Sequence, residues 1–316
     1  MLKLQRYPGN PILIPKEGNQ WEEKGTFNAS VAKLGSAFHI VYRAVSSQNV
    51  SVVGHATGDD FINFSNHGIL IEPDSEFDKF GCEDPRVTKL GDFYYIFYTG
   101  LSNKPLTPDG IKLCLAKTRD FKTLEKYPVT TFNSKAMSLF PEKINGKYVA
   151  ILTVSTDRPP IPAKIALAFF EKEEDIYSEE YWNRWFDRQD EFTLPLLRDP
   201  SDQVELGAAP VKTDVGWVVI YSYIKNYFSE NKVFGVEAAL LDLNTPLKII
   251  GRSQQSILTP EKDYELFGEV PNIVFPSGSL LDDGKLWIYY GAADSVVCLA
   301  WCEKDMLVKD LILTKR

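Results

Sequence analysis

The sequence predicts an all-β fold, a five-bladed β-propeller, from three observations. A turn containing Gly, followed by a short aromatic and β-branched run, occurs five times at intervals of 55 to 70 residues. Such runs are typical of strands. One further strand is predicted before each copy and another after it. Five units of three or four strands indicate a propeller, because a sandwich does not give five near-equal units and a parallel α/β fold needs long helical periods.

The five copies lie at residues 35–42, 91–98, 146–152, 216–221 and 284–290. The strands before them are expected at 27–31, 84–87, 140–144, 209–212 and 275–279, and four of these contain Pro near the start, where its missing N–H does least harm. The strands after them are expected at 52–56, 111–116, 164–168, 233–241 and 296–301. Only residues 171–188 have a helical pattern, which predicts a short helical insertion near there. We expect residues 1–316 to form a single propeller domain.

Charge and composition exclude several classes of partner. The net charge is −8 and the isoelectric point about 5.1, which argues against nucleic acid or an anionic membrane as the main partner. The chain has no signal-peptide pattern and no apolar run long enough to span a bilayer, so we expect a cytoplasmic protein without a membrane. The four cysteines lack CxxC spacing and are expected to be reduced core residues. The sequence leaves the oligomeric state open, and a homo-oligomer is one of the states that it allows.

The motif content leaves carboxylates as the candidate catalytic groups. The three histidines have no metal-like spacing, and the sequence has no HExxH, no GxSxG and no glycine-rich phosphate loop. We therefore expect no metal ion and no cofactor, and neither a zinc nor a serine-hydrolase mechanism.

In a propeller, the starts of the first strands and the ends of the second strands meet at one mouth of the central channel. The start positions are Asn28, Asp84, Phe140, Ala209 and Phe275, and the end positions include Arg43, Thr99, Tyr221, Tyr223 and Gly291. A polar residue at such a position either contacts substrate or caps a blade, and the sequence leaves both open.

Asp84 is the foremost of these candidates, with Glu83 and Arg86 beside it. A carboxyl that protonates a leaving group needs a raised pKa, and burial or adjacent negative charge is expected to supply it. Arg86 is expected either to hold a substrate oxyanion or to pin a neighbouring carboxylate. The same residues could instead form only a turn with an ion pair.

At these residues the chain resembles glycoside hydrolase family 130, a family of five-bladed propellers that contains inverting mannoside phosphorylases and a smaller set of inverting β-mannosidases. The resemblance runs from about residue 7 to residue 301. It rests on residues 27–29, 42–44, 81–87, 139–148, 238–243 with Pro246, 259–261 with Tyr264 and Glu265, 270–276 and 290–294.

The resemblance implies roles for several residues. Asp84 matches the catalytic acid of the family, and Arg43, Arg86 and Asp294 match residues that hold the sugar or the anion. In the sequence, Lys135 lies close to the position of a lysine that belongs to the phosphate site in the family. Position in the repeat or in the matched stretches adds four candidate substrate-binding residues, which are Asn28, Glu83, Tyr223 and Glu265. The implied partners are a mannoside oligosaccharide and, for a phosphorylase, inorganic phosphate.

Departures from the phosphorylase pattern favour hydrolysis. Two histidines usual in the phosphorylases are absent, at residues 153–160 and at Ser222, and carboxylates stand at Glu205, Glu237 and Glu269. Added carboxylates repel a phosphate dianion, whereas an inverting hydrolase needs a carboxylate base that activates water. We therefore hypothesise an inverting hydrolase of β-linked mannosides, with β-1,2 linkage among the candidates.

In this hypothesis Asp84 is the acid, Glu205 and Glu237 activate water, and Glu269 is the reserve candidate for the base. The alternatives are an inverting mannoside phosphorylase that uses Arg43, Arg86 and Lys135, and a non-catalytic sugar-binding propeller. The three glutamates could also form structural ion pairs.

Overall fold

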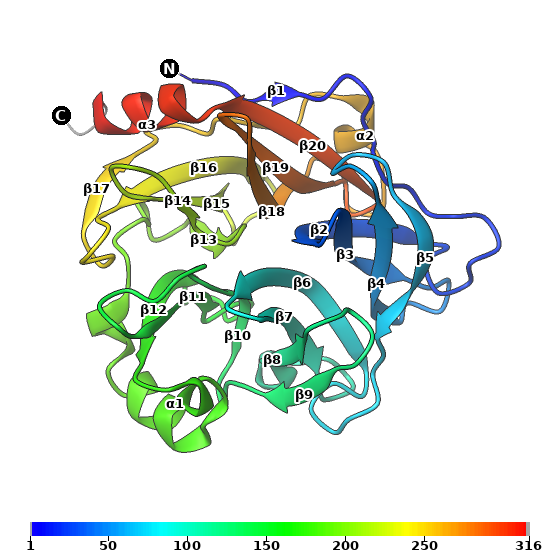
Figure 1. Ribbon diagram of the computed structural model, residues 1–316, viewed down its shortest axis with the longest axis horizontal. Helices are drawn as coiled ribbons and strands as arrows, with labels where there is room; N and C mark the ends of the chain where they lie inside the picture. Colours follow the sequence, from blue (N-terminus) through cyan, green and yellow to red (C-terminus); the bar gives the residue numbers. More distant parts are fainter. Residues whose placement is uncertain (1, 314–316) are drawn as a thin grey trace.

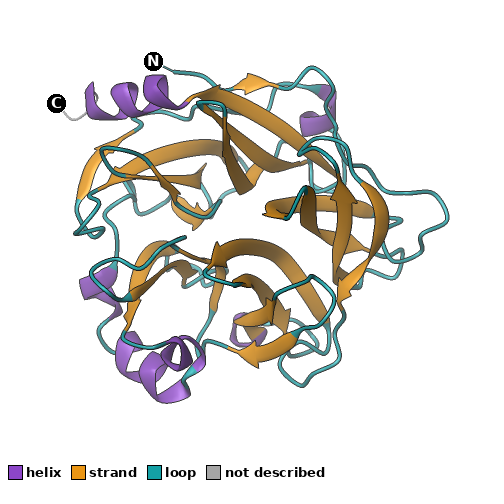
Figure 2. Ribbon diagram, in the orientation of Figure 1, coloured by secondary structure: helices purple, strands orange, loops and turns teal. Residues whose placement is uncertain are grey.

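The computed structural model describes residues 2–313, and its fold is a five-bladed β-propeller (Figure 1). Five separate sheets lie around one axis, and the blades are strand almost throughout, with the helices at the periphery (Figure 2). The predicted fold class is confirmed. No helix within residues 2–313 combines the length and the apolar character needed to cross a bilayer.

The blades follow one another along the chain. The first contains β2 (Gly25–Leu34), β3 (Ala37–Val45), β4 (Ser51–Gly58) and β5 (Ser65–Ile71), and the second β6 (Gly81–Leu90), β7 (Phe93–Leu101), β8 (Ile111–Thr118) and β9 (Glu125–Pro128). The third contains β10 (Ser134–Leu139), β11 (Tyr148–Val154) and β12 (Lys164–Phe170). The fourth contains β13 (Gln203–Leu206), β14 (Val211–Lys212), β15 (Trp217–Lys225), β16 (Val233–Leu241) and β17 (Ile249–Arg252). The fifth contains β18 (Val274–Asp282), β19 (Lys285–Ala292), β20 (Val296–Glu303) and, from the N-terminal end, β1 (Gln5–Arg6).

Apolar side chains fill the spaces between neighbouring blades. Successive residues of a strand point to opposite faces, so each blade presents apolar residues to both of its neighbours. Between the second and third blades, for example, Phe97 and Leu115 pack in one cluster with Leu139 and Leu152. The core is therefore divided into layers between blades, and the inner strands β2, β6, β10, β13 and β18 lie nearest the axis (Figure 1).

Two inner strands differ from the prediction. In the third blade the first strand is β10 rather than residues 140–144, because Pro141 cannot donate to a ladder and Phe140 instead packs edge-on against Trp217. In the fourth blade only the two-residue β14 falls within the predicted strand at 209–212, and the innermost strand is β13, which lies earlier in the chain and was not predicted.

The helical insertion at residues 171–188 is present. It consists of a 3₁₀ turn (Glu173–Tyr177) and α1 (Glu179–Phe186), with Trp182 and Trp185 buried against the third blade. Within residues 2–313 four further helical segments were not predicted. They are α2 (Asp263–Leu266), α3 (Lys304–Leu313) and two short 3₁₀ helices (Pro108–Gly110 and Gln189–Phe192).

The inner strands of the first three blades carry the same β-bulge. The ladder shifts register between Phe27 and Ser30, between Glu83 and Arg86, and between Lys135 and Ser138. The first residue of each bulge has a left-handed backbone, with φ of 51° at Asn28, 51° at Asp84 and 53° at Ala136. A bulge re-aims one side chain away from the regular alternation. Asn28 and Asp84 are thus equivalent positions, as predicted, but the third-blade equivalent is Ala136 rather than Phe140.

Four blades share a buried set of a tyrosine, a carboxylate and a basic side chain. The tyrosine lies on the second strand of the blade and is at most 1% exposed. Its hydroxyl donates a hydrogen bond to the carboxylate at 2.7 to 3.0 Å. The same carboxylate lies 2.6 to 3.5 Å from the basic side chain. The four sets are Tyr42 with Glu22 and His67, Tyr98 with Asp78 and Lys126, Tyr221 with Glu237 and Arg198, and Tyr290 with Glu265 and Arg6. Because the set recurs in blades with different surroundings, we interpret it as a structural repeat that ties outer segments to the second strand.

The set in the fifth blade closes the propeller. Arg6 on β1 contacts both oxygens of Glu265, at 2.7 and 2.9 Å, and the backbone N–H groups of Glu261 and Lys262 donate to the same carboxylate. Burial alone would raise the pKa of Glu265, but Arg6 and these backbone donors outweigh it and lower that pKa. The ionised carboxylate therefore holds the N-terminal strand in place.

Replacing Glu265 with Gln is expected to lower the free energy of unfolding by about 3 kcal/mol near pH 7, because Arg6 loses its anionic partner in a buried site. The lowered pKa means that this stabilisation is full above the unfolded-state value, about 4.3, and is lost as the pH falls through the folded-state value. Urea unfolding at several pH values checks it. The gap between wild type and variant should narrow below about pH 4. Glu261→Gln is the matched control, since Glu261 contacts the same Arg6 from an exposed position and should cost under about 1 kcal/mol. Equal losses for the two variants would contradict the prediction.

Candidate active site

Asp84, on the inner strand of the second blade, contacts two residues of the first blade. Its side chain leaves the ladder at the bulge of β6, and Asn28, at the equivalent bulge of β2, donates from Nδ2 to Asp84 Oδ1 at 2.8 Å. A terminal nitrogen of Arg43 lies 3.6 Å from the same oxygen. Three residues predicted from different segments therefore come together at one carboxylate.

Glu83 is bound more tightly than Asp84 to the same arginine. A terminal nitrogen of Arg43 lies 2.5 Å from Glu83 Oε1, and Ser51 bridges the two, accepting from Arg43 Nε at 3.0 Å and donating to Glu83 at 3.2 Å. The first contact of Arg43 is thus with Glu83. Asp84 keeps the longer contact, and its side chain is 14% exposed.

The pKa of Asp84 differs from the expectation. Burial raises it, but Arg43 and Arg86 together with the Asn28 hydrogen bond outweigh burial, so the pKa of Asp84 is lowered in the substrate-free protein. The opposite holds for Asp294, where burial dominates over Arg43 and raises the pKa to about 6. Burial, opposed by Arg43, also raises the pKa of Glu83. In this cluster the carboxyl that holds a proton most readily near neutral pH is therefore not Asp84.

Lys135 and Glu205 form the second part of the site, from β10 and β13. Lys135 Nζ lies 3.1 Å from Glu205 Oε2 and 4.0 Å from Asp157 Oδ2. Gln203 donates from Nε2 to the other oxygen of Glu205 at 2.5 Å, and the hydroxyl of Tyr227 donates to Asp157 at 2.6 Å. Burial lowers the pKa of Lys135, but the carboxylates around it prevail and raise that pKa, so the ammonium is charged.

Arg86 lies beneath the site rather than in it. Its Nε donates to the carbonyl of Gly207 at 2.6 Å, and its terminal nitrogens donate to the carbonyls of Leu206 at 3.0 Å and Asp84 at 2.8 Å. The side chain is 1% exposed. All of these acceptors are backbone oxygens, so we interpret Arg86 as a positioning residue that joins β6 to β13 and not as a ligand of sugar or anion.

The predicted pair of Glu205 and Glu237 is separated by the register of the fourth blade. Glu205 pairs with Ser222 and Glu237 with Tyr221, so the two glutamates belong to successive rows and point to opposite faces of the sheet. Glu237 is 0% exposed and binds both terminal nitrogens of Arg198, at 2.6 and 2.8 Å. We interpret it as the fourth-blade member of the tyrosine, carboxylate and base repeat.

Two predicted substrate-binding residues have structural partners as well. The hydroxyl of Tyr223 donates to Asp202 at 2.7 Å, and the guanidinium of Arg198 lies 3.8 Å from the centre of its ring. Glu265 is saturated by the contacts that close the fifth blade. Neither side chain contacts the cluster around Asp84.

A cavity of about 190 Å³ adjoins Arg43 and Asp294. Lys24 and Glu269, joined by an ion pair of 2.8 Å, lie at its rim. Glu269 was the reserve candidate for the base, and Lys24 was not predicted. The full lining consists of Lys24, Gly25, Phe27, Arg43, Val45, Asn49, Ser51, Glu269, Val270 and Asp294.

Sequence reasoning missed residues that support the site, among them Ser51 and Gln203 at the starts of β4 and β13 and Asp157 and Tyr227 in turns. Each lies within about six residues of a predicted strand, and no pattern marks which of them faces the axis. The only available signal was proximity to a strand end, which many other polar residues share.

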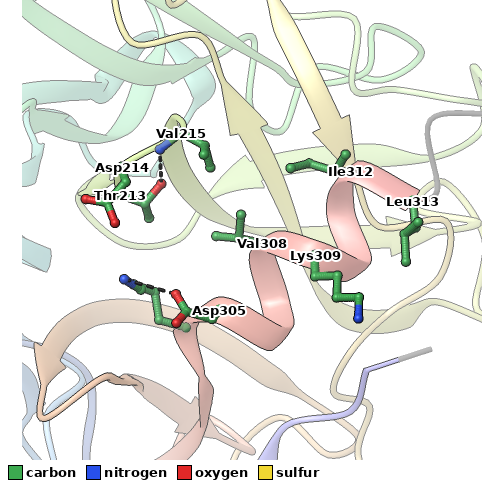
Figure 3. Close-up of a pocket in the computed structure, with 9 residues that line it drawn as sticks. Thr213, Asp214, Val215, Asp305, Val308, Lys309, Ile312 and Leu313 are labelled. Carbon is green, nitrogen blue, oxygen red and sulfur yellow. Dashed lines mark hydrogen bonds and ion pairs between the residues drawn. The ribbon is translucent and has the colours of Figure 1, made fainter.

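A second hollow, of about 340 Å³, lies between α3 and the turn at Thr213, Asp214 and Val215 (Figure 3). Val308, Ile312 and Leu313 of α3 line one side of it. None of the residues around Asp84 borders this hollow. Arg43, which lies 3.6 Å from Asp84, lines the smaller cavity, and Asp157 and Tyr227 line a further hollow, so we place the candidate active site at Asp84 and Lys135, beside these two openings.

The structure is a propeller whose inner strands bring carboxylates and cations together beside a cavity lined by Arg43, Glu269 and Asp294. The family model described as β-1,4-mannooligosaccharide phosphorylase matches residues 3–312. The chain belongs to glycoside hydrolase family 130.

Curated relatives and a solved structure agree with this assignment. A 1,2-β-oligomannan phosphorylase from Thermoanaerobacter sp. (strain X514) is 34% identical, over 97% of this chain and 99% of its own. A β-1,2-mannobiose phosphorylase from the same organism is 31% identical, over 96% and 99%. The structure of β-1,2-mannobiose phosphorylase from Listeria innocua with β-1,2-mannobiose superposes with a TM-score of 0.81 at 24% identity, over 99% of this chain and 100% of that one, which supports the fold.

Proposed function

We propose that this protein is an inverting β-mannoside phosphorylase that uses inorganic phosphate to cleave β-linked mannosides, β-1,2-linked ones first among them. The observation that carries the proposal is Lys135, a charged ammonium on the inner strand of the blade next to Asp84. An anionic nucleophile needs such a cation and hydrogen-bond donors around it. The names of the two relatives above, which cover nearly the whole chain, support the same reaction and its linkage.

In the proposed reaction a phosphate oxygen bonds to the anomeric carbon as the bond from that carbon to the glycosidic oxygen breaks. Asp84 supplies the proton that the leaving oxygen takes up, and the products are a sugar 1-phosphate and a shortened mannoside. Asp84 must therefore be protonated in the complex, although its pKa is lowered in the free protein. A bound phosphate dianion brings negative charge next to Asp84 and raises that pKa, which couples acid and nucleophile.

Hydrolysis is the second candidate, and Glu205 favours it. Its carboxylate lies 3.1 Å from Lys135, where it competes with phosphate for the same cation. Held by Gln203 and Lys135, it could activate a water instead. Glu237, the other half of the hypothesised base pair, has a structural role in our interpretation, so the case for hydrolysis now depends on Glu205 alone.

Phosphate dependence decides between the two candidates. β-1,2-Mannobiose is incubated with and without inorganic phosphate, and the products are separated by mass. Phosphorolysis is expected to yield mannose 1-phosphate, with mannose alone appearing in the absence of phosphate only at trace level. Phosphate-independent release of two mannose molecules would overturn the proposal in favour of hydrolysis. No turnover of any β-mannoside, with binding retained, would indicate a sugar-binding propeller.

A further inference from the structure

Each junction between neighbouring blades contains a hydrogen bond from a hydroxyl group of one blade to the backbone of the next. The hydroxyl either donates to a carbonyl or accepts from an N–H, at 2.8 to 3.2 Å. The five hydroxyls belong to Ser30, Thr88, Thr153, Ser277 and Ser279. These bonds fix the place of one blade relative to the next.

At the junction of the third and fourth blades, Thr153 connects the two strands that carry Lys135 and Glu205. Thr153 on β11 pairs directly with Lys135 on β10. Its hydroxyl accepts a hydrogen bond from the N–H of Leu206 on β13 at 2.8 Å, and that N–H belongs to the peptide group that follows Glu205. The two charged groups that this side chain links lie 3.1 Å apart.

The hydroxyl of Thr153 lies on an otherwise apolar face of β11. Alternate residues of a strand share a face, so Val149 and Ile151 point the same way as Thr153. Both pack in the apolar cluster between the third and fourth blades. Thr153 itself is 0% exposed. Valine has nearly the same shape, so packing alone does not require a hydroxyl here, whereas the N–H of Leu206 does.

Leu206 is held on both sides. Its N–H is held from the third blade by Thr153, and its carbonyl is held from the second blade by a terminal nitrogen of Arg86 at 3.0 Å. Glu205 is the residue before it, so the position of Leu206 sets the position of the Glu205 carboxylate. Removing one of the two bonds leaves β13 free to move away from β11 and Lys135.

We propose that Thr153 is a positioning residue that holds Glu205 beside Lys135 and thereby sets how strongly the site resists phosphate. The inference rests on the proposed function, in which phosphate binds at Lys135. A phosphate dianion there meets the repulsion of the Glu205 carboxylate. When β13 moves away from β11, Glu205 moves with it and the repulsion falls. Thr153 acts only through these two residues and takes no part in bond breaking.

The test is Thr153→Val, which removes the hydroxyl and keeps the shape of the side chain. The KM for phosphate is expected to fall by about two- to tenfold, the range that one neutral hydrogen bond spans. Both kcat and the KM for β-1,2-mannobiose should stay within about twofold of wild type, because Thr153 acts on the phosphate side alone. An unchanged or raised KM for phosphate would overturn the inference.

A double-mutant cycle shows whether Thr153 acts through Glu205. In the Glu205→Gln background, Thr153→Val should leave the KM for phosphate unchanged, since residues that act through one another are not additive. Additive effects of the two substitutions would mean that Thr153 acts by another route, against the inference.

Controls separate positioning from general loosening of the blades. Thr153→Ser keeps the hydroxyl and should retain the wild-type KM for phosphate. Thr88→Val removes the equivalent hydroxyl bond, from Thr88 to the carbonyl of Leu139 at 3.2 Å, between the second and third blades. It should lower the melting temperature and leave the KM for phosphate unchanged. An equal fall in KM for Thr88→Val would contradict a specific role of Thr153. If Thr153→Val does not fold, Thr153→Cys replaces it with the same expectation, because a thiol is only a weak acceptor.

The proposed function can fail separately. If wild type releases mannose without phosphate, phosphorolysis is wrong, and Glu205 is then the base. In that case Thr153→Val should lower the rate of mannose release while Thr153→Ser retains it, and a wild-type rate in Thr153→Val would overturn the positioning role. If wild type cleaves no mannoside, calorimetry with inorganic phosphate replaces rates. Thr153→Val should then bind phosphate more tightly than wild type, and equal binding or none would overturn the inference.

Discussion

Replacing Asp84 with Asn is expected to lower kcat/KM for a β-mannoside by about 10²- to 10⁴-fold, the usual contribution of a positioned general acid. Asn is close in shape to Asp, tolerates the left-handed backbone at this bulge, and can still accept the hydrogen bond from Asn28. The melting temperature should therefore stay near that of wild type. Initial rates with excess phosphate, together with thermal unfolding, measure both effects.

The control for Asp84→Asn is Glu76→Gln, which neutralises an exposed carboxylate outside the site. It should leave both rate and melting temperature unchanged. A second substrate sharpens the test. A mannoside whose leaving group is a good phenolate needs little protonation, so it should lose much less rate in the Asp84→Asn variant. An equal loss on both substrates would contradict the role of Asp84 as the acid.

Replacing Lys135 with Ala is expected to raise the KM for phosphate by about 10- to 100-fold, from the 1.5 to 3 kcal/mol that a hydrogen bond to a charged group contributes. The KM for the mannoside should change far less, since the ion-pair partners of Lys135 are Glu205 and Asp157, and neither lines the cavity beside Arg43 and Asp294. Initial rates over a range of phosphate concentrations at saturating mannoside provide the measurement.

Glu205→Gln is the counterpart of Lys135→Ala and should act in the opposite direction. It removes a carboxylate that lies 3.1 Å from Lys135, so phosphate meets less repulsion and its KM should fall. The two proposed functions diverge here. A hydrolase that relies on Glu205 as its base would lose mannose release in this variant, whereas a phosphorylase keeps or gains activity. Loss of all turnover in Glu205→Gln, with the fold intact, would refute the phosphorylase proposal.

The five-bladed architecture was predictable because its signal is repeated. One copy of the aromatic run is a weak indication of a strand, but five copies at similar intervals along the chain indicate a five-bladed propeller. The error in the third blade has a local cause. Phe140 and Pro141 mimic the start of the other inner strands, while the true strand β10 contains Ser134 and Lys135 and carries no aromatic residue.

The site was predictable where both partners lie in segments that the repeat or the family resemblance marks. Asp84, Glu83 and Arg43 belong to such segments, and the structure brings them together. The role of Glu237 could not be predicted, because its partner Arg198 lies in the irregular segment before β13, which neither the repeat nor the resemblance marks. Without that partner, a buried glutamate in a strand suggests catalysis. With it, the same glutamate repeats what Glu22 does in the first blade.

The identical bulges at Asn28, Asp84 and Ala136 have a consequence for how such an enzyme can change over evolution. Each of these residues lies outside the regular inter-strand pairing, so a new side chain there alters the channel while the ladder on either side keeps its hydrogen bonds. A substitution at these positions can therefore change the chemistry of the channel while the fold of the blade stays the same. At the third bulge, Ala136 contributes only a methyl group. A polar side chain could replace it there without changing the strand pairing of the third blade.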